Sequence, residues 1–184
     1  MKSFARILAA AAVAGAFAGA PALADSKMVG GAPMYPTKDI IDNAVNSKDH
    51  TTLVAAVKSA GLVETLKGPG PFTVFAPTNA AFSALPAGTV ETLLKPENKA
   101  QLGKVLTYHV VPGKLDAAAV LAAIKAGNGK AMVKTVSGGT LTLSTMGGNV
   151  IVADETGATG MVTIADVYQS NGVIHVVDKV LLPK

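Results

Sequence analysis

The sequence predicts an α+β fold in which helices and strands form separate layers. Apolar residues recur at helical spacing through most of residues 37–126, interrupted by a strand-like run within the stretch 70–85. From residue 130 the pattern changes to short alternating runs separated by Gly-Gly, Thr-Gly-Ala-Thr-Gly and Asn-Gly, which is typical of antiparallel strands joined by tight turns. Because helices come first and strands last, the order favours segregated layers over repeated βαβ units.

Residues 1–24 have the pattern of a signal peptide. Lys2 and Arg6 precede an alanine-rich apolar run, and Ala22-Leu23-Ala24 fits the small-x-small pattern of a signal peptidase site. A transmembrane anchor is the alternative, but the apolar stretch is short and a cleavage motif follows it. We therefore expect cleavage after Ala24, a periplasmic or secreted protein, and no membrane span once the signal is removed.

The remaining chain is predicted to form a flexible lead-in and one domain. Residues 25–36 contain Gly and Pro without periodicity, which indicates the lead-in. Residues 37–183 are expected to be a single domain, long enough to bury a core of its own. The chain contains no Cys, so neither a disulfide nor a lipid attached through cysteine contributes.

The charge pattern argues against a nucleic-acid partner. Lys2 and Arg6 leave with the signal, so the net charge falls from +4 to +2. The remaining lysines are scattered singly, Trp is absent, and the aromatics do not interleave with a basic stripe. The electrostatic footprint and the stacking platform of nucleic-acid binders are therefore both missing.

Helical spacing recurs in five segments, at 40–45, 53–57, 90–94, 102–106 and 115–126. Asp49 or Thr51 is expected to cap the second of these helices, and Gly61 to end it. Pro96 suits a first helical position. The run TYHVV at 107–111 is rich in β-branched and aromatic residues up to Pro112-Gly113, which indicates a strand.

The stretch 70–85, GPFTVFAPTNAAFSAL, holds every Phe that follows the signal segment. Phe72 and Phe75 are three apart on a strand and so point to opposite faces, which predicts a strand covered on both sides. Phe82 and Leu85 are three apart on the helix that follows and can share one apolar face. We therefore interpret the stretch as a junction of the core.

The turn in this stretch could also be a catalytic nucleophile elbow. That elbow requires Gly-x-Ser-x-Gly between strand and helix, whereas the chain has Ala-Pro-Thr-Asn. Thr78 is more simply an N-cap whose side-chain oxygen accepts a backbone N–H of the helix that starts at Asn79 or Ala80. No nucleophile is predicted here.

The histidines and carboxylates suggest neither an enzyme nor a metal site. The three histidines lie far apart in sequence, and no His-x-x-x-His pair occurs. Asp154-Glu155 and Asp166 lack the alternating ladder of a calcium loop, and residues 154–157 are predicted to form a turn. His109 and His175 each lie in an apolar run, so we expect partly buried imidazoles bonded to backbone or to a nearby carboxylate, with Asp178 as the candidate partner for one of them. We expect a non-enzymatic protein without metal or cofactor.

Three segments together resemble the fasciclin (FAS1) domain family. TVFAPTNAAF at 73–82 is similar to its first box, Tyr108-His109 to its central motif, and NGVIHVVDKVLLP at 171–183 to its second box. The resemblance implies a wedge of mostly antiparallel strands packed with an N-terminal helical layer. It assigns a structural role to the following box residues: Phe72, Phe75, Thr78, Asn79, Phe82, His175 and Asp178.

The resemblance also implies a role in adhesion. The matching contact candidates are Tyr108, His109, Asp166 and Val167, where Val replaces the Ile of the family's Asp-Ile pair. We therefore expect adhesion, aggregation or contact with an envelope or cell-surface protein or polysaccharide. The alternative is a soluble carrier of an apolar ligand such as a carotenoid or a lipid, although the small number of aromatic residues argues mildly against a pigment site.

Overall fold

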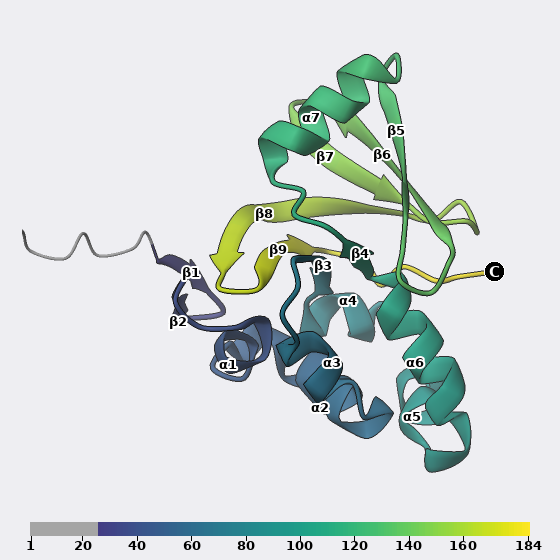
Figure 1. The fold of residues 1–184 in the computed structure, drawn as a ribbon. Coiled ribbons are helices and arrows are strands. Elements are labelled where there is room, and N and C mark those ends of the chain that lie inside the picture. Colours follow the sequence, from purple (N-terminus) through teal and green to yellow (C-terminus); the bar gives the residue numbers. More distant parts are fainter. Residues whose placement is uncertain (1–25) are drawn as a thin grey trace, which may run out of the picture.

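The structure is a computed structural model that describes residues 26–184. It consists of a bent sheet with helices on both sides (Figure 1). The predicted signal segment lies outside the described residues. Six helices from residues 40–108 cover one side of the central strands. A single later helix covers the other side, where the strands of the second half diverge. The predicted α+β class is confirmed.

The helices and strands follow the chain in this order. The N-terminal elements are β1 (Lys27–Val29), β2 (Ala32–Met34), α1 (Ile40–Ala44), α2 (Thr51–Ala60), α3 (Val63–Lys67), β3 (Phe72–Pro77), α4 (Asn79–Ser83), α5 (Thr89–Leu94), α6 (Lys99–Tyr108) and β4 (Val110–Pro112). The later elements are α7 (Ala117–Ala126), β5 (Lys130–Lys134), β6 (Thr140–Met146), β7 (Asn149–Ala153), β8 (Thr159–Gln169) and β9 (Gly172–Val177). Short 3-10 turns, Lys48–His50 and Pro96–Asn98, precede α2 and α6.

The wedge shape follows from the pairing of β8. The main sheet has the order β4-β3-β9-β8-β7-β6-β5, and its strands are antiparallel except for the β3–β9 pair. β8 pairs with β7 only through residues 159–161 and with β9 from residue 162 onward. The two halves of the sheet therefore separate along β8, and α7 fills the opening between them (Figure 1).

Two apolar clusters lie on opposite faces of β3. One packs the helical layer against β3 and β9, and the other lies between the opened strands and α7. Phe75 belongs to the second cluster, while Phe72 packs against the first. Phe82 and Leu85 both contact the first cluster. The prediction that the strand is covered on both sides is confirmed. α4 ends at Ser83, so the prediction that Leu85 shares a helix face with Phe82 is wrong, although both side chains pack in the same cluster.

The lead-in predicted for residues 25–36 contains a β-hairpin, so that prediction is wrong for β1 and β2. Val29 and Met34 point inward and are each about 1% exposed. The chain after the hairpin is held by Asn43, whose Oδ1 accepts the Tyr35 N–H at 2.9 Å and whose Nδ2 donates to the Tyr35 carbonyl at 2.8 Å. Each strand of the hairpin has three residues, which is too short for an alternating pattern to be visible in the sequence.

Two of the predicted helix boundaries are confirmed. Thr78 caps α4, because its Oγ1 accepts the Ala81 N–H at 3.3 Å. Gly61 ends α2 in the left-handed region, with φ of 73°. A positive φ of this size is strained for residues that carry a Cβ, which explains why Gly stands there.

The cap predicted for α2 comes from elsewhere in the chain. His50 precedes the helix and makes no side-chain capping bond, and neither Asp49 nor Thr51 supplies one. Instead, Asn79 Oδ1 accepts the Thr52 N–H at 3.0 Å. The free N–H groups of a helix can be satisfied by any nearby acceptor, so this cap could not be read from local sequence.

Asn171 joins the β8–β9 turn to the helical layer. Its Oδ1 accepts the Ile40 N–H at 3.1 Å, and its Nδ2 donates to the carbonyls of Leu66 at 2.7 Å and Gly68 at 3.0 Å. We expect Asn171→Ala to lower the free energy of unfolding by about 2–4 kcal/mol, because three backbone groups lose their partner. Urea unfolding followed by circular dichroism measures this loss.

The matched control for Asn171 is Asn46→Ala. Asn46 is exposed and its side chain donates one hydrogen bond, to the Asp42 carbonyl at 2.8 Å. Its removal should change stability by less than about 0.5 kcal/mol. Equal unfolding midpoints for the two variants would show that Asn171 does not hold the layers together.

Candidate functional site

The predicted strand at 107–111 begins later than expected. α6 continues through Tyr108, and His109 keeps helical dihedral angles before β4 starts at Val110. Leu102, Val105 and Leu106 keep the apolar face of the helix on the core up to this point. The β-branched and aromatic composition of TYHVV is therefore divided between the last turn of a helix and a short strand.

Tyr108 is fully buried and does not present its ring to solvent. Its hydroxyl donates to the Thr140 carbonyl at 2.8 Å and accepts the Glu155 N–H at 3.0 Å. The ring packs on Gly139, where an added Cβ would lie 2.5 Å from the nearest ring carbon. Burial raises the pKa of Tyr108 above its ordinary value. The two hydrogen bonds of the Tyr108 hydroxyl link α6 to the start of β6 and to the turn that follows β7.

His109 is buried beside Tyr108 and holds the last segment of the chain. Its Nδ1 donates to the Val105 carbonyl at 2.8 Å, and its Nε2 accepts the Leu181 N–H at 2.9 Å. Burial lowers the pKa of His109 to about 4, so the imidazole is neutral at pH 7. The predicted buried imidazole bonded to backbone is therefore confirmed.

Asp178 does not bond to either histidine of the box motifs. Its Oδ1 accepts the Met161 N–H at 2.7 Å, which links the end of β9 to β8. His175 instead donates from Nε2 to the Leu115 carbonyl at 2.7 Å and accepts the Asp166 N–H at Nδ1 at 3.4 Å. The expectation of an Asp178 partner is wrong, because the backbone satisfies both imidazoles.

Asp166 lies at a β-bulge in β8. The register with β9 shifts between Ile164 and Val167, and Asp166 adopts φ of 56°. Its Oδ1 accepts the Ala117 N–H at 2.6 Å, so it satisfies the first turn of α7. Val167 is about 1% exposed, whereas Asp166 is half-buried. Of the four predicted contact residues, the structure leaves only Asp166 partly at the surface.

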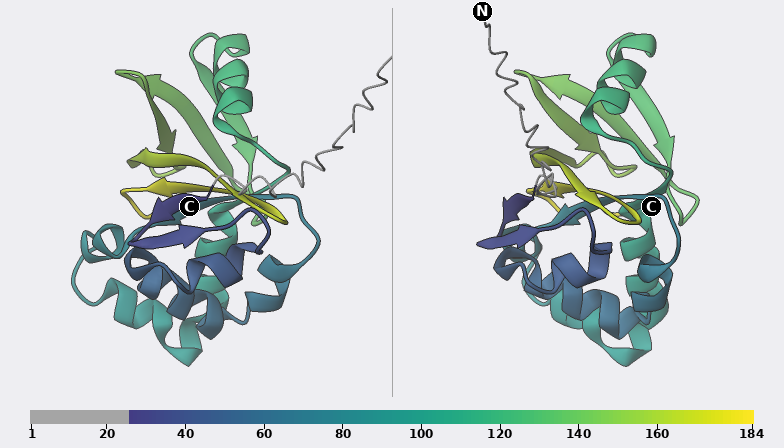
Figure 2. Two further views of the ribbon diagram at one scale, coloured as in Figure 1. Left: turned by 90° about the vertical axis from the view of Figure 1, so that its left-hand side faces the viewer. Right: turned by 60° about the vertical axis from the view of Figure 1, so that its left-hand side comes forward.

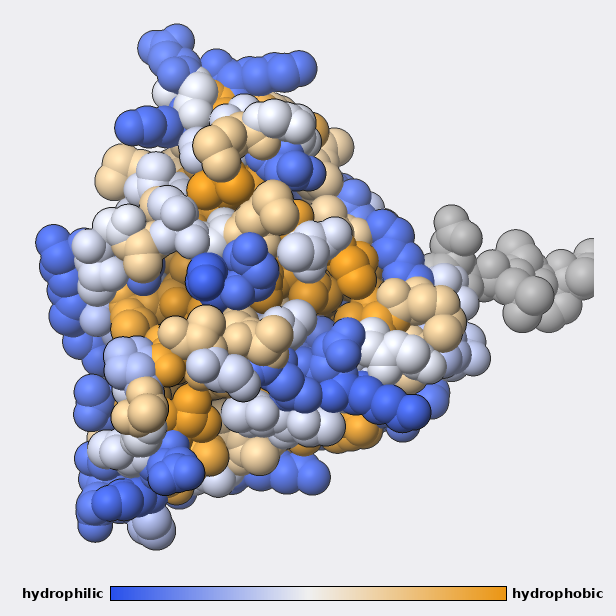
Figure 3. All heavy atoms as spheres, turned by 180° about the vertical axis from the view of Figure 1, so that it is seen from behind, coloured by the Kyte–Doolittle hydropathy of each residue, from blue (hydrophilic) through white to orange (hydrophobic). Residues whose placement is uncertain are grey.

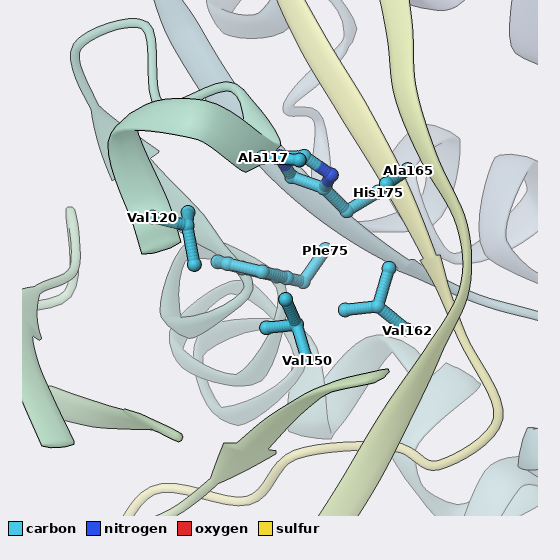
Figure 4. A pocket seen from close by; sticks show the side chains of 7 residues that line it. All are labelled: Phe75, Ala117, Val120, Val150, Val162, Ala165 and His175. Atoms are coloured by element: carbon cyan, nitrogen blue, oxygen red, sulfur yellow. The ribbon is translucent and has the colours of Figure 1, made fainter. Parts of the chain in front are cut away.

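A small cavity lies under α7, lined by Phe75, Ala117, Val120, Val150, Val162, Ala165 and His175 (Figure 4). His175 stacks on Phe75 with the ring centroids 5.6 Å apart. The space open to the centre of a water molecule is about 10 Å³, enough for about one water. In this conformation the cavity has no room for a carotenoid or a lipid.

Exposed apolar and aromatic side chains occur on the end of β8 and on the hairpin beside it. Tyr168 is 36% exposed, with Lys114 Nζ 4.8 Å from its ring centroid. Lys27 Nζ donates to the Ala165 carbonyl at 2.6 Å, which holds β1 beside β8. Met28, the next residue of β1, is 61% exposed. We call Met28, Lys114, Asp166 and Tyr168 the β8-end surface.

The figures show the setting of the β8-end surface. The hairpin lies beside the turn that joins β8 to β9, and the start of α7 lies above the same strands (Figure 2). On the back of the molecule, hydrophobic residues reach the surface between hydrophilic ones, also close to where the described chain begins (Figure 3). Sequence reasoning missed Met28, Lys114 and Tyr168, because Met28 fell in the predicted lead-in and no motif marks the other two.

Within residues 26–184, no three His, Cys, Asp or Glu side chains come together in a way that could hold a metal ion. In the same part of the chain, no helix has the length and apolar character needed to cross a membrane.

Comparisons with known proteins agree in pointing to one family. The family model named Fasciclin domain matches residues 48–183. Protein sll1483 of Synechocystis is 48% identical over 100% of this chain and 99% of its own length. Immunogenic protein MPB70 of Mycobacterium bovis is 36% identical over 76% of this chain and 66% of its own length.

An animal relative and a solved structure extend this likeness. Transforming growth factor-beta-induced protein ig-h3 of Sus scrofa is 36% identical over 80% of this chain, which corresponds to 20% of that protein. The solved FAS1 domain pair of the insect cell adhesion molecule fasciclin I matches with a TM-score of 0.70 and 16% identity, over 80% of this chain and 52% of that one. At that identity the match shows the fold, and it confirms the predicted wedge with its helical layer.

Proposed function

Because the chain belongs to the fasciclin family, we propose that it is an exported, non-enzymatic protein that acts in adhesion or aggregation through contact with an envelope or cell-surface partner. The proposal places the protein in the periplasm or outside the cell. The insect relative of the same fold is a cell adhesion molecule, which supports a contact role. The observation that carries the proposal is the β8-end surface, in which Tyr168 is exposed with Lys114 over its ring and Met28 is exposed on the adjacent hairpin.

The polar residues of the family motifs support the non-enzymatic part of the proposal. His109, His175 and Asp166 each bond to backbone groups of neighbouring elements, as described above. A general base requires a free nitrogen or oxygen within reach of a substrate. Both nitrogens of each imidazole and Oδ1 of Asp166 hold α7 and the last segment of the chain, and so these groups serve the fold.

The composition of the β8-end surface suits a protein or polysaccharide partner. Protein interfaces depend on a few anchors, among which Tyr is enriched, and Met adapts to irregular surfaces. Lys114 over the Tyr168 ring holds the aromatic side chain at the surface. The carboxylate of Asp166 also lies near Tyr168. The Tyr168 ring is therefore flanked by a hydrogen-bond acceptor, Asp166, and a donor, Lys114.

We expect the double substitution Met28→Ser and Tyr168→Ser to weaken attachment at least about tenfold, because it removes both apolar anchors. Strains that lack the gene and carry each variant are compared for attachment to surfaces and for clumping. The purified variant should unfold within about 0.5 kcal/mol of the unchanged protein, since both side chains are exposed.

The matched control is Met146→Ser, which removes an exposed Met from the end of β6. Met146 is 70% exposed, comparable to Met28. It should leave attachment unchanged. Equal attachment by the double variant and the control would locate the contact elsewhere. If loss of the gene changes neither attachment nor clumping, the adhesion proposal itself is wrong.

A further inference from the structure

A groove of about 580 Å³ lies between α5, α6 and the last residues of the chain. It lies at the opposite end of the molecule from the hairpin, where the C-terminal segment passes α6 (Figure 1). Its lining residues are Thr89, Leu93, Ala100, Gln101, Lys104, Val105, Leu182, Pro183 and Lys184. Pockets that take small molecules have volumes of about 300–1,000 Å³, so this groove has a suitable size.

The groove has an apolar floor and a positively charged rim. Leu93 and Val105 form part of the buried core, and Leu182 and Pro183 are half-buried beside them. Every charged side chain among the lining residues is a lysine. The carboxylate of Glu155 approaches the tail, with Oε2 3.5 Å from Lys184 N, and it does not belong to the lining.

Lys104 has hydrogen-bonding capacity left for a ligand. Its Nζ donates one hydrogen bond in the described structure, to the main-chain oxygen of Lys184 at 2.9 Å. An ammonium group has three N–H donors, so two remain. Lys104 already holds an oxygen atom at the edge of the groove, which shows that this position is within reach of an acceptor.

We propose that this groove binds a single-chain amphiphile with an anionic head group. The head group lies against the ammonium groups of Lys104 and Lys184. The alkyl chain covers Ala100, Leu182 and Pro183, which removes apolar surface from water on both sides. A cationic head group is disfavoured by the lysines, and a head group without charge gains no charge-assisted hydrogen bond.

The first test measures binding of NBD-labelled dodecanoate to the full domain, at concentrations where the amphiphile is monomeric. We expect saturable binding, competed by dodecanoate and by dodecyl phosphate and not by dodecyltrimethylammonium or dodecyl maltoside. Stronger competition by one anion than by the other distinguishes a carboxylate from a phosphate head group. Competition by the neutral or cationic amphiphile at equal strength overturns the proposal.

Two variants locate the site. Lys104→Met keeps an apolar stem and removes the charge, and it should weaken binding about tenfold, the effect of losing one charge-assisted hydrogen bond. Ala100→Trp adds bulk at an exposed position of α6 that lines the groove, and it should abolish binding. Unchanged melting temperatures show that both variants are folded.

The controls are the same substitutions on α7. Lys125→Met and Ala118→Trp alter exposed residues of that helix and should leave binding unchanged. Binding that survives Lys104→Met at full strength, or that is lost in Ala118→Trp, overturns the proposal, and the second result places the probe near the α7 cavity. Attachment through the β8-end surface is independent of this groove and is tested separately.

Discussion

Replacing Tyr108 with Ala is expected to lower the free energy of unfolding by about 3–5 kcal/mol, the range for removing a large aromatic side chain from a core. The ring is fully buried, and its hydroxyl joins Thr140 and Glu155 in two different turns. The substitution leaves a cavity beside Gly139 and two backbone groups without their partner. Urea unfolding followed by circular dichroism measures the loss.

Two further variants separate the contributions to stability. One distinguishes the Tyr108 ring from its hydroxyl, and the other shows the effect of removing a tyrosine from the surface. Tyr108→Phe keeps the ring and should cost about 1–3 kcal/mol. Tyr168→Ala removes a partly exposed tyrosine from the β8-end surface and should alter stability much less while weakening attachment. If Tyr108→Ala unfolds normally and loses attachment, Tyr108 is a contact residue after all.

Acidification is expected to destabilise the protein, largely through His109. The pKa of His109 is about 4 in the folded chain, below its ordinary value of 6.5. Between these values the unfolded chain binds a proton that the folded chain does not, so the free energy of unfolding falls as the pH falls. The contribution is complete above about pH 6.5 and is lost by about pH 4, and it amounts to about 3 kcal/mol.

The structural reason lies at Nε2. A proton added to that nitrogen would face the Leu181 N–H, which is itself a donor, and the charged ring would lie in a buried site. Burial also lowers the pKa of His50 and of His175, so they act in the same direction. We therefore expect acid to loosen the last segment of the chain and the start of α7.

His109→Gln isolates this contribution. The measured quantity is the difference between the free energies of unfolding at pH 7 and at pH 4.5, which allows for a constant cost of the substitution. That difference should be smaller in the variant than in the unchanged protein, although His50 and His175 keep part of it. Identical differences in the two proteins would show that His109 does not control the response to acid.

Local patterns predicted most of the fold. Gly-Gly and Asn-Gly turns, the Thr78 cap and the glycine that ends α2 each depend on the residue's own conformational preference, and all of them are found where they were expected. The failures have a different origin. The cap of α2 comes from Asn79, and Lys27 of the hairpin bonds to Ala165 of β8, so partners distant in sequence contribute to both features.

The candidate site was less predictable than the fold. The resemblance marked Tyr108, His109 and Asp166 as contact candidates, but whether such a residue faces solvent depends on the elements that cover it. Thr140, Glu155 and Leu181 bury the Tyr-His pair, and all three come from the second half of the chain. Tyr168 lies at the surface because the bulge at Asp166 shifts the register of β8 against β9. No local sequence motif predicts this bulge.

The central position of β9 determines when the chain can fold during its synthesis. β9 pairs with β3 on one side and with β8 on the other, yet it includes only residues 172–177 near the end of the chain. Until the ribosome releases it, both neighbours keep an unpaired edge, and such edges promote association between chains. An interrupted chain that stops before β9 should therefore aggregate instead of folding in part, and folding has to wait for the last strand.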